Sequence, residues 1–278
     1  MAETTRAGFA VALPGTEQSA EPGRDSARRS RLAPYGAALL TILVGWQLAS
    51  LFFPSFLIPS PRTVLFRLGR EMVSQKFLVT TARSFVRLGI GFGLASLLGV
   101  VIGLSTGVWG PFRRYTRALV SILQSIPPIA WVPLFIILLG FGDRPIILVI
   151  VISAFFPMAV SVMNAVEHVD PLHLDVARLM GASPLQLARK VYAPAVFPAI
   201  VTGSQVGFGN AWRSLIAAEM VGGVNIGLGW YITIAGEIAD MTGVLAGIVV
   251  IGLLSAALDT WGLEHLKRRL LRWKYAAP

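Results

Sequence analysis

Four polar side chains within one apolar stretch, residues 193–220, are the first candidates for binding chemistry: Gln205, Asn210, Arg213 and Glu219. Ionisable groups inside such a stretch are costly and are functional candidates by default. A guanidinium at Arg213 offers a fork of donors that matches a sulfonate, nitrate or carboxylate. Alternatively, Arg213 pairs with Glu219, Asn210 or a partner subunit, or lies in an aqueous vestibule. For Glu219, near one end of the stretch, the alternative is an interfacial or structural role.

A second candidate region surrounds Pro127 and Pro128 in the apolar stretch 119–140. The polar side chains that flank this pair are Gln124, Ser125 and Trp131. Two adjacent prolines do not both fit an undistorted helix interior, so the pair predicts a kink. Irregular backbone in an apolar stretch is tolerated where it is buried in protein or lines a cavity. We therefore expect this region to line a cavity, with simple packing as the alternative.

The composition of the chain requires lipid around it. Of its 278 residues, 55% are hydrophobic and 14% are charged, whereas about 25% of a soluble domain is charged. The formal net charge is +10, but the basic residues cluster beside apolar stretches, which is typical of membrane orientation and not of nucleic-acid binding. The chain has no cysteine, which excludes disulfides and thiolate chemistry. Its three histidines show no metal-ligand spacing, so no metal site is expected.

Six stretches are long and apolar enough to cross a membrane, which takes about 20 residues. They are residues 35–53, 88–107, 119–140, 145–166, 193–220 and 241–258. The sequence therefore predicts an all-α membrane protein with six transmembrane helices in residues 34–278. Residues 1–33 have no apolar periodicity and are expected to form a disordered cytoplasmic tail. The alternative, a cleaved signal peptide, conflicts with the length of the first apolar stretch and with the absence of a small-x-small cleavage site.

Basic clusters orient the predicted bundle. They precede the first span, follow the sixth, and lie between spans two and three and between spans four and five. The positive-inside rule places all four clusters and both termini in the cytoplasm. The first external loop disagrees with this rule. Its basic residues, with two more at the entry to span two, are Arg62, Arg67, Arg70, Lys76, Arg83 and Arg87. A partly amphipathic segment along the outer interface would reconcile the loop with this topology.

The cytoplasmic loop 167–192 predicts two short amphipathic helices. Asp170 and Pro171 have the form of a helix start, and Gly181 stands where a left-handed residue ends a helix. Between them lies an apolar stripe formed by Leu172, Val176, Leu179 and Met180. Ser183 and Gln186 have capping-box spacing for a second helix. Such a stripe must bury against something, either the lipid interface or another protein.

This loop resembles the EAA loop of bacterial ABC importer permeases, E-A-A-x3-G-x9-I-x-L-P. The matching residues are Asp175-Val176-Ala177-x3-Gly181-x9-Val191-x-Ala193-Pro194. The spacing is the same throughout, and the four replacements keep charge or apolar character. Further segments are similar to permeases for sulfonate, taurine, nitrate and bicarbonate uptake. They are SIPPIAWVPLFIILLGFG (125–142), AFFPMAV (154–160), LIAAEMVGG (215–223), GLGWYI (227–232) and LEHLKRRLLRW (263–273).

The resemblance implies a type I ABC importer permease fold with cytoplasmic coupling helices. The residues that would fit a groove on a separate nucleotide-binding subunit are Asp175, Val176, Ala177, Gly181, Ala182 and Ser183. ATP-driven closure of that subunit would move the spans as rigid bodies. Asp175 would bond to a basic group on the ATPase or cap its own helix. The candidates for the translocation path are Gln124, Ser125, Trp131, Asn210 and Arg213.

The resemblance also implies partners. The chain has no P-loop of G-x4-G-K-[ST] form, so ATP and Mg are expected on the partner, with no cofactor and no catalysis in this chain. The expected assembly holds two ATPase subunits, a second permease copy and a periplasmic or lipid-anchored solute-binding protein in the bacterial inner membrane. The expected solute is a small anion such as an alkanesulfonate, taurine or nitrate. The alternatives are a channel or secondary transporter not driven by ATP, and a membrane enzyme, for which no His or carboxylate constellation is visible.

Overall fold

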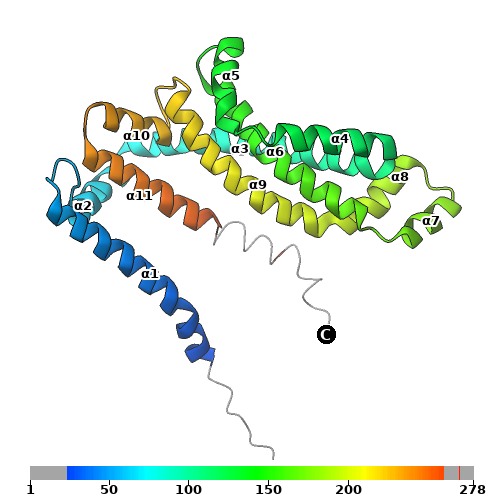
Figure 1. The fold of residues 1–278 in the computed structure, drawn as a ribbon, viewed down its shortest axis with the longest axis horizontal. Coiled ribbons are helices and arrows are strands. Elements are labelled where there is room, and N and C mark those ends of the chain that lie inside the picture. The colour runs from blue at the N-terminus through cyan, green and yellow to red at the C-terminus, as the bar shows by residue number, and fades with distance from the viewer. Residues whose placement is uncertain (1–23, 260–268, 270–278) are drawn as a thin grey trace, which may run out of the picture. The chain divides into compact units, whose positions relative to one another are not determined.

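The computed structural model describes residues 24–259 and residue 269, and every regular element in these residues is a helix (Figure 1). The chain divides into two compact units, residues 1–52 and residues 53–278. The first unit contains α1 (Arg24–Phe52). This helix begins ten residues before the expected boundary at residue 34, because Ala, Arg and Leu in residues 24–33 are good helix formers. The rest of the expected tail, residues 1–23, lies outside the described residues.

The second unit holds the remaining helices. They are α2 (Pro61–Met72), α3 (Gln75–Val108), α4 (Gly110–Leu123), the 3₁₀-helix η1 (Pro128–Trp131), α5 (Val132–Leu139), α6 (Asp143–Glu167), α7 (Pro171–Leu179), α8 (Pro184–Leu187), the π-helix η2 (Ala188–Tyr192), α9 (Ala193–Val221), α10 (Leu228–Glu237) and α11 (Met241–Ala257). The long helices α3, α6 and α9 pack side by side, with α6 in contact with both others (Figure 1).

Small residues set the close packing of α3 against α6. They recur at every fourth position of α3 and are Gly91, Ala95, Gly99, Gly103 and Gly107. A Cβ atom added to Gly103 would lie 2.6 Å from Cβ of Val162, and one added to Gly99 would lie 2.7 Å from Cγ of Met158. Small residues let the backbones of membrane helices approach closely. The two helices therefore touch along a face that has no room for larger side chains.

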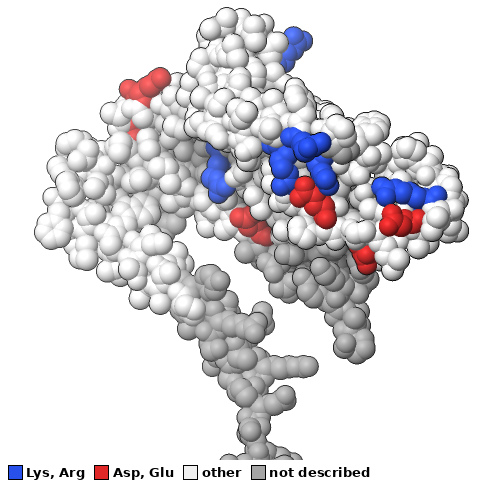
Figure 2. Space-filling view, turned by 45° about the vertical axis from the view of Figure 1, so that its right-hand side comes forward, with Lys and Arg blue, Asp and Glu red and all other residues white. Residues whose placement is uncertain are grey.

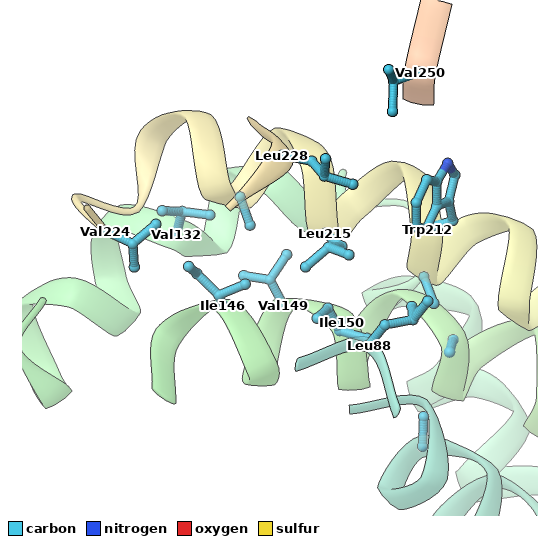
Figure 3. Packing of buried hydrophobic residues seen from close by; sticks show 14 of the residues in the cluster. Leu88, Val132, Ile146, Val149, Ile150, Trp212, Leu215, Val224, Leu228 and Val250 are labelled. Carbon is cyan, nitrogen blue, oxygen red and sulfur yellow. The ribbon is translucent and has the colours of Figure 1, made fainter. Parts of the chain in front are cut away.

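The main apolar core lies where these helices meet α5, α10 and α11. Figure 3 shows Leu88 of α3, Ile150 of α6, Leu215 of α9 and Leu228 of α10 within one apolar cluster between these helices. Outside this core, many large apolar side chains are exposed, including Ile137, which is 81% exposed. Most of the face seen in Figure 2 carries no charge. An apolar exterior of this kind is suited to lipid.

The six predicted spans all coincide with helices, but not all are complete spans by length and composition. Within residues 24–259 and residue 269, three helices meet both criteria, namely α3, α6 and the continuous helix Pro184–Val221. Two apolar helical segments are shorter than a complete span. They are Gly36–Phe52 within α1 and the whole of α11, and each has 17 residues. The predicted span 119–140 is broken. Its halves, Pro111–Leu123 and Pro128–Leu139, meet at 87°, so the predicted kink at Pro127 and Pro128 is confirmed and is sharper than a kink within one helix.

A helix lies in each of the two segments that precede the second and the sixth predicted spans. In the first of these, α2 forms the amphipathic segment that the misplaced basic residues had suggested, and it begins at Ser60, whose side chain accepts a hydrogen bond from the Thr63 amide. In the other, α10 was not predicted. Its N-cap, Gly227, has no side chain with which to mark a helix start, so local sequence signals do not reveal it.

Candidate functional site

The first helix of the candidate coupling segment forms as predicted. Asp170 caps α7 by accepting a hydrogen bond from the Leu172 amide at 2.9 Å. Gly181 adopts φ +78°, the left-handed conformation expected at the end of the helix. The Ala182 amide then donates to the Ala177 carbonyl at 3.0 Å. These bonds hold the turn that joins α7 to α8 in one conformation.

The two faces of α7 differ in burial. On the inner face, Leu174 and Ala177 pack beside buried Leu187 and Tyr192. The outer face is the predicted apolar stripe, whose residues are 66% (Leu172), 48% (Val176), 88% (Leu179) and 83% (Met180) exposed. Nothing in the described residues covers this stripe. The helix is therefore anchored on one side and presents an apolar surface on the other.

The second predicted short helix is the beginning of a longer one. The capping box of Ser183 and Gln186 is present, with the Ser183 amide donating to Gln186 Oε1 at 2.7 Å. The chain then continues through the π-helix η2 into α9, so that Pro184–Val221 is one continuous helix of 38 residues. The predicted helix start at Ser183 is therefore confirmed, but this helix runs on into α9 and is not a separate short helix.

Asp175 pairs with its own helix. Its Oδ1 lies 3.2 Å from Nη1 of Arg178, one turn further along α7, and both side chains are more than half exposed. Because Asp170 is the cap, Asp175 does not cap the helix. An exposed ion pair of this type is weak, so the Asp175 carboxylate remains accessible to a partner.

Three of the five candidate path residues lie around one pocket. Gln124, Asn210 and Arg213 line a cavity of about 340 Å³, together with Ser153, Ser214 and the apolar residues Ile126, Pro128, Phe156 and Pro157. Nη2 of Arg213 donates to Oδ1 of Asn210 at 2.6 Å. Of the alternatives for Arg213, the pairing with Asn210 is therefore present. The pocket lies at the break between α4 and η1, where irregular backbone had been expected to line a cavity.

Ser125 and Trp131 do not line this pocket. The Ser125 hydroxyl donates to the Ser121 carbonyl at 3.0 Å. Trp131 stacks on Phe135, with ring centroids 6.2 Å apart and an angle of 19° between the planes. Both side chains thus make local contacts near the break.

A comparison with known proteins identifies the family. Residues 95–272 match the family of binding-protein-dependent transport system inner membrane components. The chain belongs to this family. It is therefore a membrane-embedded permease subunit of an ABC importer.

The permease is similar to the taurine transport system permease protein TauC of Escherichia coli, with 33% identity over 245 residues, 86% of this chain and 88% of the relative. It is also 30% identical over 273 residues to the putative aliphatic sulfonates transport permease protein SsuC of Bacillus subtilis, covering 97% and 98% of the two chains. A solved structure of the MetNI methionine ABC transporter, in an inward-facing conformation, superposes with a TM-score of 0.58 at 22% identity over 71% of this chain and 99% of that chain. This likeness shows the type I ABC importer permease fold.

Glu219 of the permease does not pair with Arg213. It is only 1% exposed, and its Oε1 lies 2.6 Å from Nη1 of Arg87 on α3. The structural alternative for Glu219 is thus the one observed. Sequence reasoning grouped Arg87 with the basic residues at the entry to span two and missed this pairing. The sequence signal that could have revealed the pairing was Arg87 itself, which lies one helical turn after Ser84 in a helix whose later residues are apolar.

The described part of the permease, residues 24–259 with residue 269, contains no group of three His, Asp or Glu side chains that could hold a metal ion. Several of its ionisable side chains form ion pairs instead, such as Arg117 of α4 with Glu167, the last residue of α6, at 2.9 Å. The features that bear on function are therefore the exposed stripe of α7 and the pocket around Arg213.

Proposed function

We propose that this permease carries a small organic sulfonate such as taurine across the inner membrane, with Arg213 as the anion contact. The observation that carries the proposal is the position of Arg213 in a pocket of about 340 Å³ between α4, α6 and α9. Binding sites for small molecules have volumes of about 300–1,000 Å³. The names of the relatives from Escherichia coli and Bacillus subtilis, which specify taurine and aliphatic sulfonates, support the same solute class.

The chemistry of the pocket is suited to such a solute. No carboxylate among the described residues lies within ion-pair distance of Arg213, whose hydrogen-bond partner is the neutral amide of Asn210. The guanidinium has five donors in a planar fork, so most remain for an anion. Gln124, Ser153 and Ser214 add neutral polar groups, while Phe156 and Pro157 supply apolar surface for a short alkyl chain.

Energy for transport would enter through α7. In this proposal the exposed apolar stripe of α7 and the turn at Gly181 dock on an ATPase subunit, which binds ATP and Mg. Residues Asp175, Val176, Ala177, Gly181, Ala182 and Ser183 form this contact. The complete importer would contain two permease copies, two ATPase subunits and a periplasmic or lipid-anchored solute-binding protein. The basic clusters favour a cytoplasmic location for α7 and both termini.

The experiment is uptake of taurine and of an alkanesulfonate by proteoliposomes that hold the permease with its cognate ATPase and solute-binding protein. Arg213→Ala removes a charged hydrogen-bond donor, worth about 1.5–3 kcal/mol, so we expect KM to rise by at least about tenfold. Arg70→Ala, at an exposed arginine of α2, is the control and leaves uptake unchanged. A thermal-shift screen of the solute-binding protein identifies the ligand independently. Unchanged uptake by Arg213→Ala would remove this residue from the path.

A further inference from the structure

The carboxylate of Glu219 lies at the end of α9, in the interior of the bundle, and receives several hydrogen bonds. Arg87 Nη1 donates to Oε1 at 2.6 Å, and the Ser84 hydroxyl lies 2.8 Å from Oε1 and 2.9 Å from Oε2. The Gly229 amide donates to Oε2 at 3.0 Å. All three side chains are buried, with exposures of 1% for Glu219, 2% for Arg87 and 0% for Ser84. We call Ser84, Arg87 and Glu219 the latch.

The latch caps α10 from two other helices. The first amides of a helix have no partner within it and need one from outside. Here the Leu228 amide donates to the Ser84 hydroxyl at 3.0 Å, and the Gly229 amide donates to Glu219. Arg87 Nη1 also donates to the Ile226 carbonyl at 2.8 Å, just before the helix. The start of α10 is thus bound to α3 and α9 through its backbone amides.

The packing at this point leaves no free space. A Cβ atom on Gly227, whose φ is +153°, would lie 2.5 Å from the Glu219 carboxyl carbon, and one on Gly229 would lie 2.3 Å from the Ile216 carbonyl oxygen. The latch also reaches α6, because Asp143, the first residue of that helix, lies 2.7 Å from Nη2 of Arg87. Four helices therefore meet at this set of groups, in which Arg87 and Glu219 are buried and Asp143 is half exposed.

Stability alone does not account for this arrangement. Replacing a buried ion pair by well-packed apolar side chains is often neutral or stabilising. What a set of directed hydrogen bonds adds is a single fixed geometry between the elements that it joins. In the latch, the fixed elements are the end of α9 and the beginning of α10.

The helix that carries Glu219 also carries the coupling segment. Pro184–Val221 is continuous over 38 residues, a length of about 57 Å. In Figure 1, α7 and α8 lie at one end of this helix and α10 at the other. We propose that the latch residues are positioning residues that hold α10 and the loop 222–227 in a fixed position on α9. A movement imposed at α7 then carries α9, the loop and α10 together as one rigid body. This inference rests on the proposed docking of an ATPase at α7.

The test measures whether α9 and α10 move as one body. Because the chain has no cysteine, spin labels can be placed at Val206→Cys on α9 and Ile238→Cys after α10, which are 54% and 70% exposed. Their separation is measured in the complex with the ATPase, first without nucleotide and then trapped with ATP and vanadate. With the latch intact, we expect the same distance in both states. In Ser84→Ala and in Glu219→Gln, we expect the distance to shift by more than about 2 Å between the states.

The control is Ser96→Ala, the same substitution on the same helix. The Ser96 hydroxyl is buried and has no hydrogen-bond partner in the described part of the chain, so this variant should behave like the parent. Docking is followed separately by maleimide modification of Leu179→Cys, which the ATPase should protect. If Leu179→Cys is not protected, the docking proposal fails and the latch role fails with it. If it is protected and the latch variants still show one distance in both states, only the latch role is overturned.

Discussion

The carboxylate of Glu219 and the guanidinium of Arg87, 132 positions apart in the sequence, lie 2.6 Å apart in the interior of the helix bundle. Both side chains are buried, so the counter-charge of Glu219 comes from Arg87, which also pairs with Asp143 at 2.7 Å. The pair joins the end of α9 to α3 at a point where four helices converge.

We predict that Arg87→Ala strongly destabilises the permease. Removing one partner of a buried ion pair leaves the other charge uncompensated, at a cost of about 3–5 kcal/mol. Thermal unfolding of the detergent-solubilised protein measures the effect as a lowered Tm. Arg83→Ala, four residues earlier on the same helix and exposed, should leave the Tm unchanged. Equal melting of the two variants would contradict this assignment.

We predict that Gly103→Val disrupts the packing of α3 against α6. The added side chain would begin 2.6 Å from Val162, and overpacking of a filled interior costs about 1–3 kcal/mol. The matched control is Gly93→Val on the same helix, where a Cβ atom would meet nothing within 4 Å. The measurement is the Tm of each variant in detergent. If Gly93→Val lowers the Tm as much as Gly103→Val does, the loss of stability comes from placing a β-branched residue in the helix and not from the contact with Val162.

Local signals predicted local structure well. The cap at Asp170, the left-handed Gly181 and the capping box at Ser183 were all read correctly, because each depends on residues a few positions apart. The pairing of Arg87 with Glu219 was out of reach, since it depends on the tertiary arrangement of α3 and α9. The start of α10 was hidden for a related reason, because its cap is supplied by other helices.

The partner of Arg213 shows the same limit within one helix. Asn210 and Glu219 are both on α9, and the sequence favoured neither. The structure selects Asn210 because it lies three residues away on the same face of the helix, whereas Glu219 points into the bundle toward Arg87. The face of the helix on which each side chain lies, and not its charge, decides the pairing.

Stability should fall in alkaline solution because of Tyr231 on α10. Burial, and then the hydrogen bond that its hydroxyl donates to Glu71, raise the pKa of Tyr231 above its ordinary value, which is about 10. The folded state therefore keeps this proton where the unfolded state has lost it, so the stabilisation is complete below about pH 10 and is lost as the pH rises above that value. We expect Tyr231→Phe to reduce the fall in Tm between pH 9 and about pH 11.

Two comparisons support that measurement. Tyr115→Phe, at a tyrosine that is 67% exposed, should keep the alkaline fall of the parent protein. At neutral pH, Tyr231→Phe should lose about 1 kcal/mol for the hydrogen bond. If the alkaline fall is the same in Tyr231→Phe as in the parent, another group is responsible for it.

Gly181→Asp should abolish the stimulation of ATP hydrolysis by the loaded solute-binding protein while leaving membrane insertion intact. In the described residues, a Cβ atom at this position would meet nothing within 4 Å, so the permease itself has room for the side chain. Asp also tolerates the left-handed conformation better than most residues. The expected loss therefore comes from the ATPase that docks against the turn. Stimulation that persists in Gly181→Asp would place the coupling contact elsewhere.

The exposed stripe of α7 should be required for holding the ATPase. Leu179 is 88% exposed on a helix whose opposite face is packed, so Leu179→Asp should preserve the fold of the permease. It places a charge where an apolar partner surface would have to bury it, and burying an unpaired charge is highly unfavourable. We expect the ATPase to be lost from Leu179→Asp on co-purification but retained by Ile238→Asp, which changes an equally apolar and 70% exposed residue next to α10. Retention by both variants would show that α7 rests on lipid, and loss from both would indicate a general effect of the added charge.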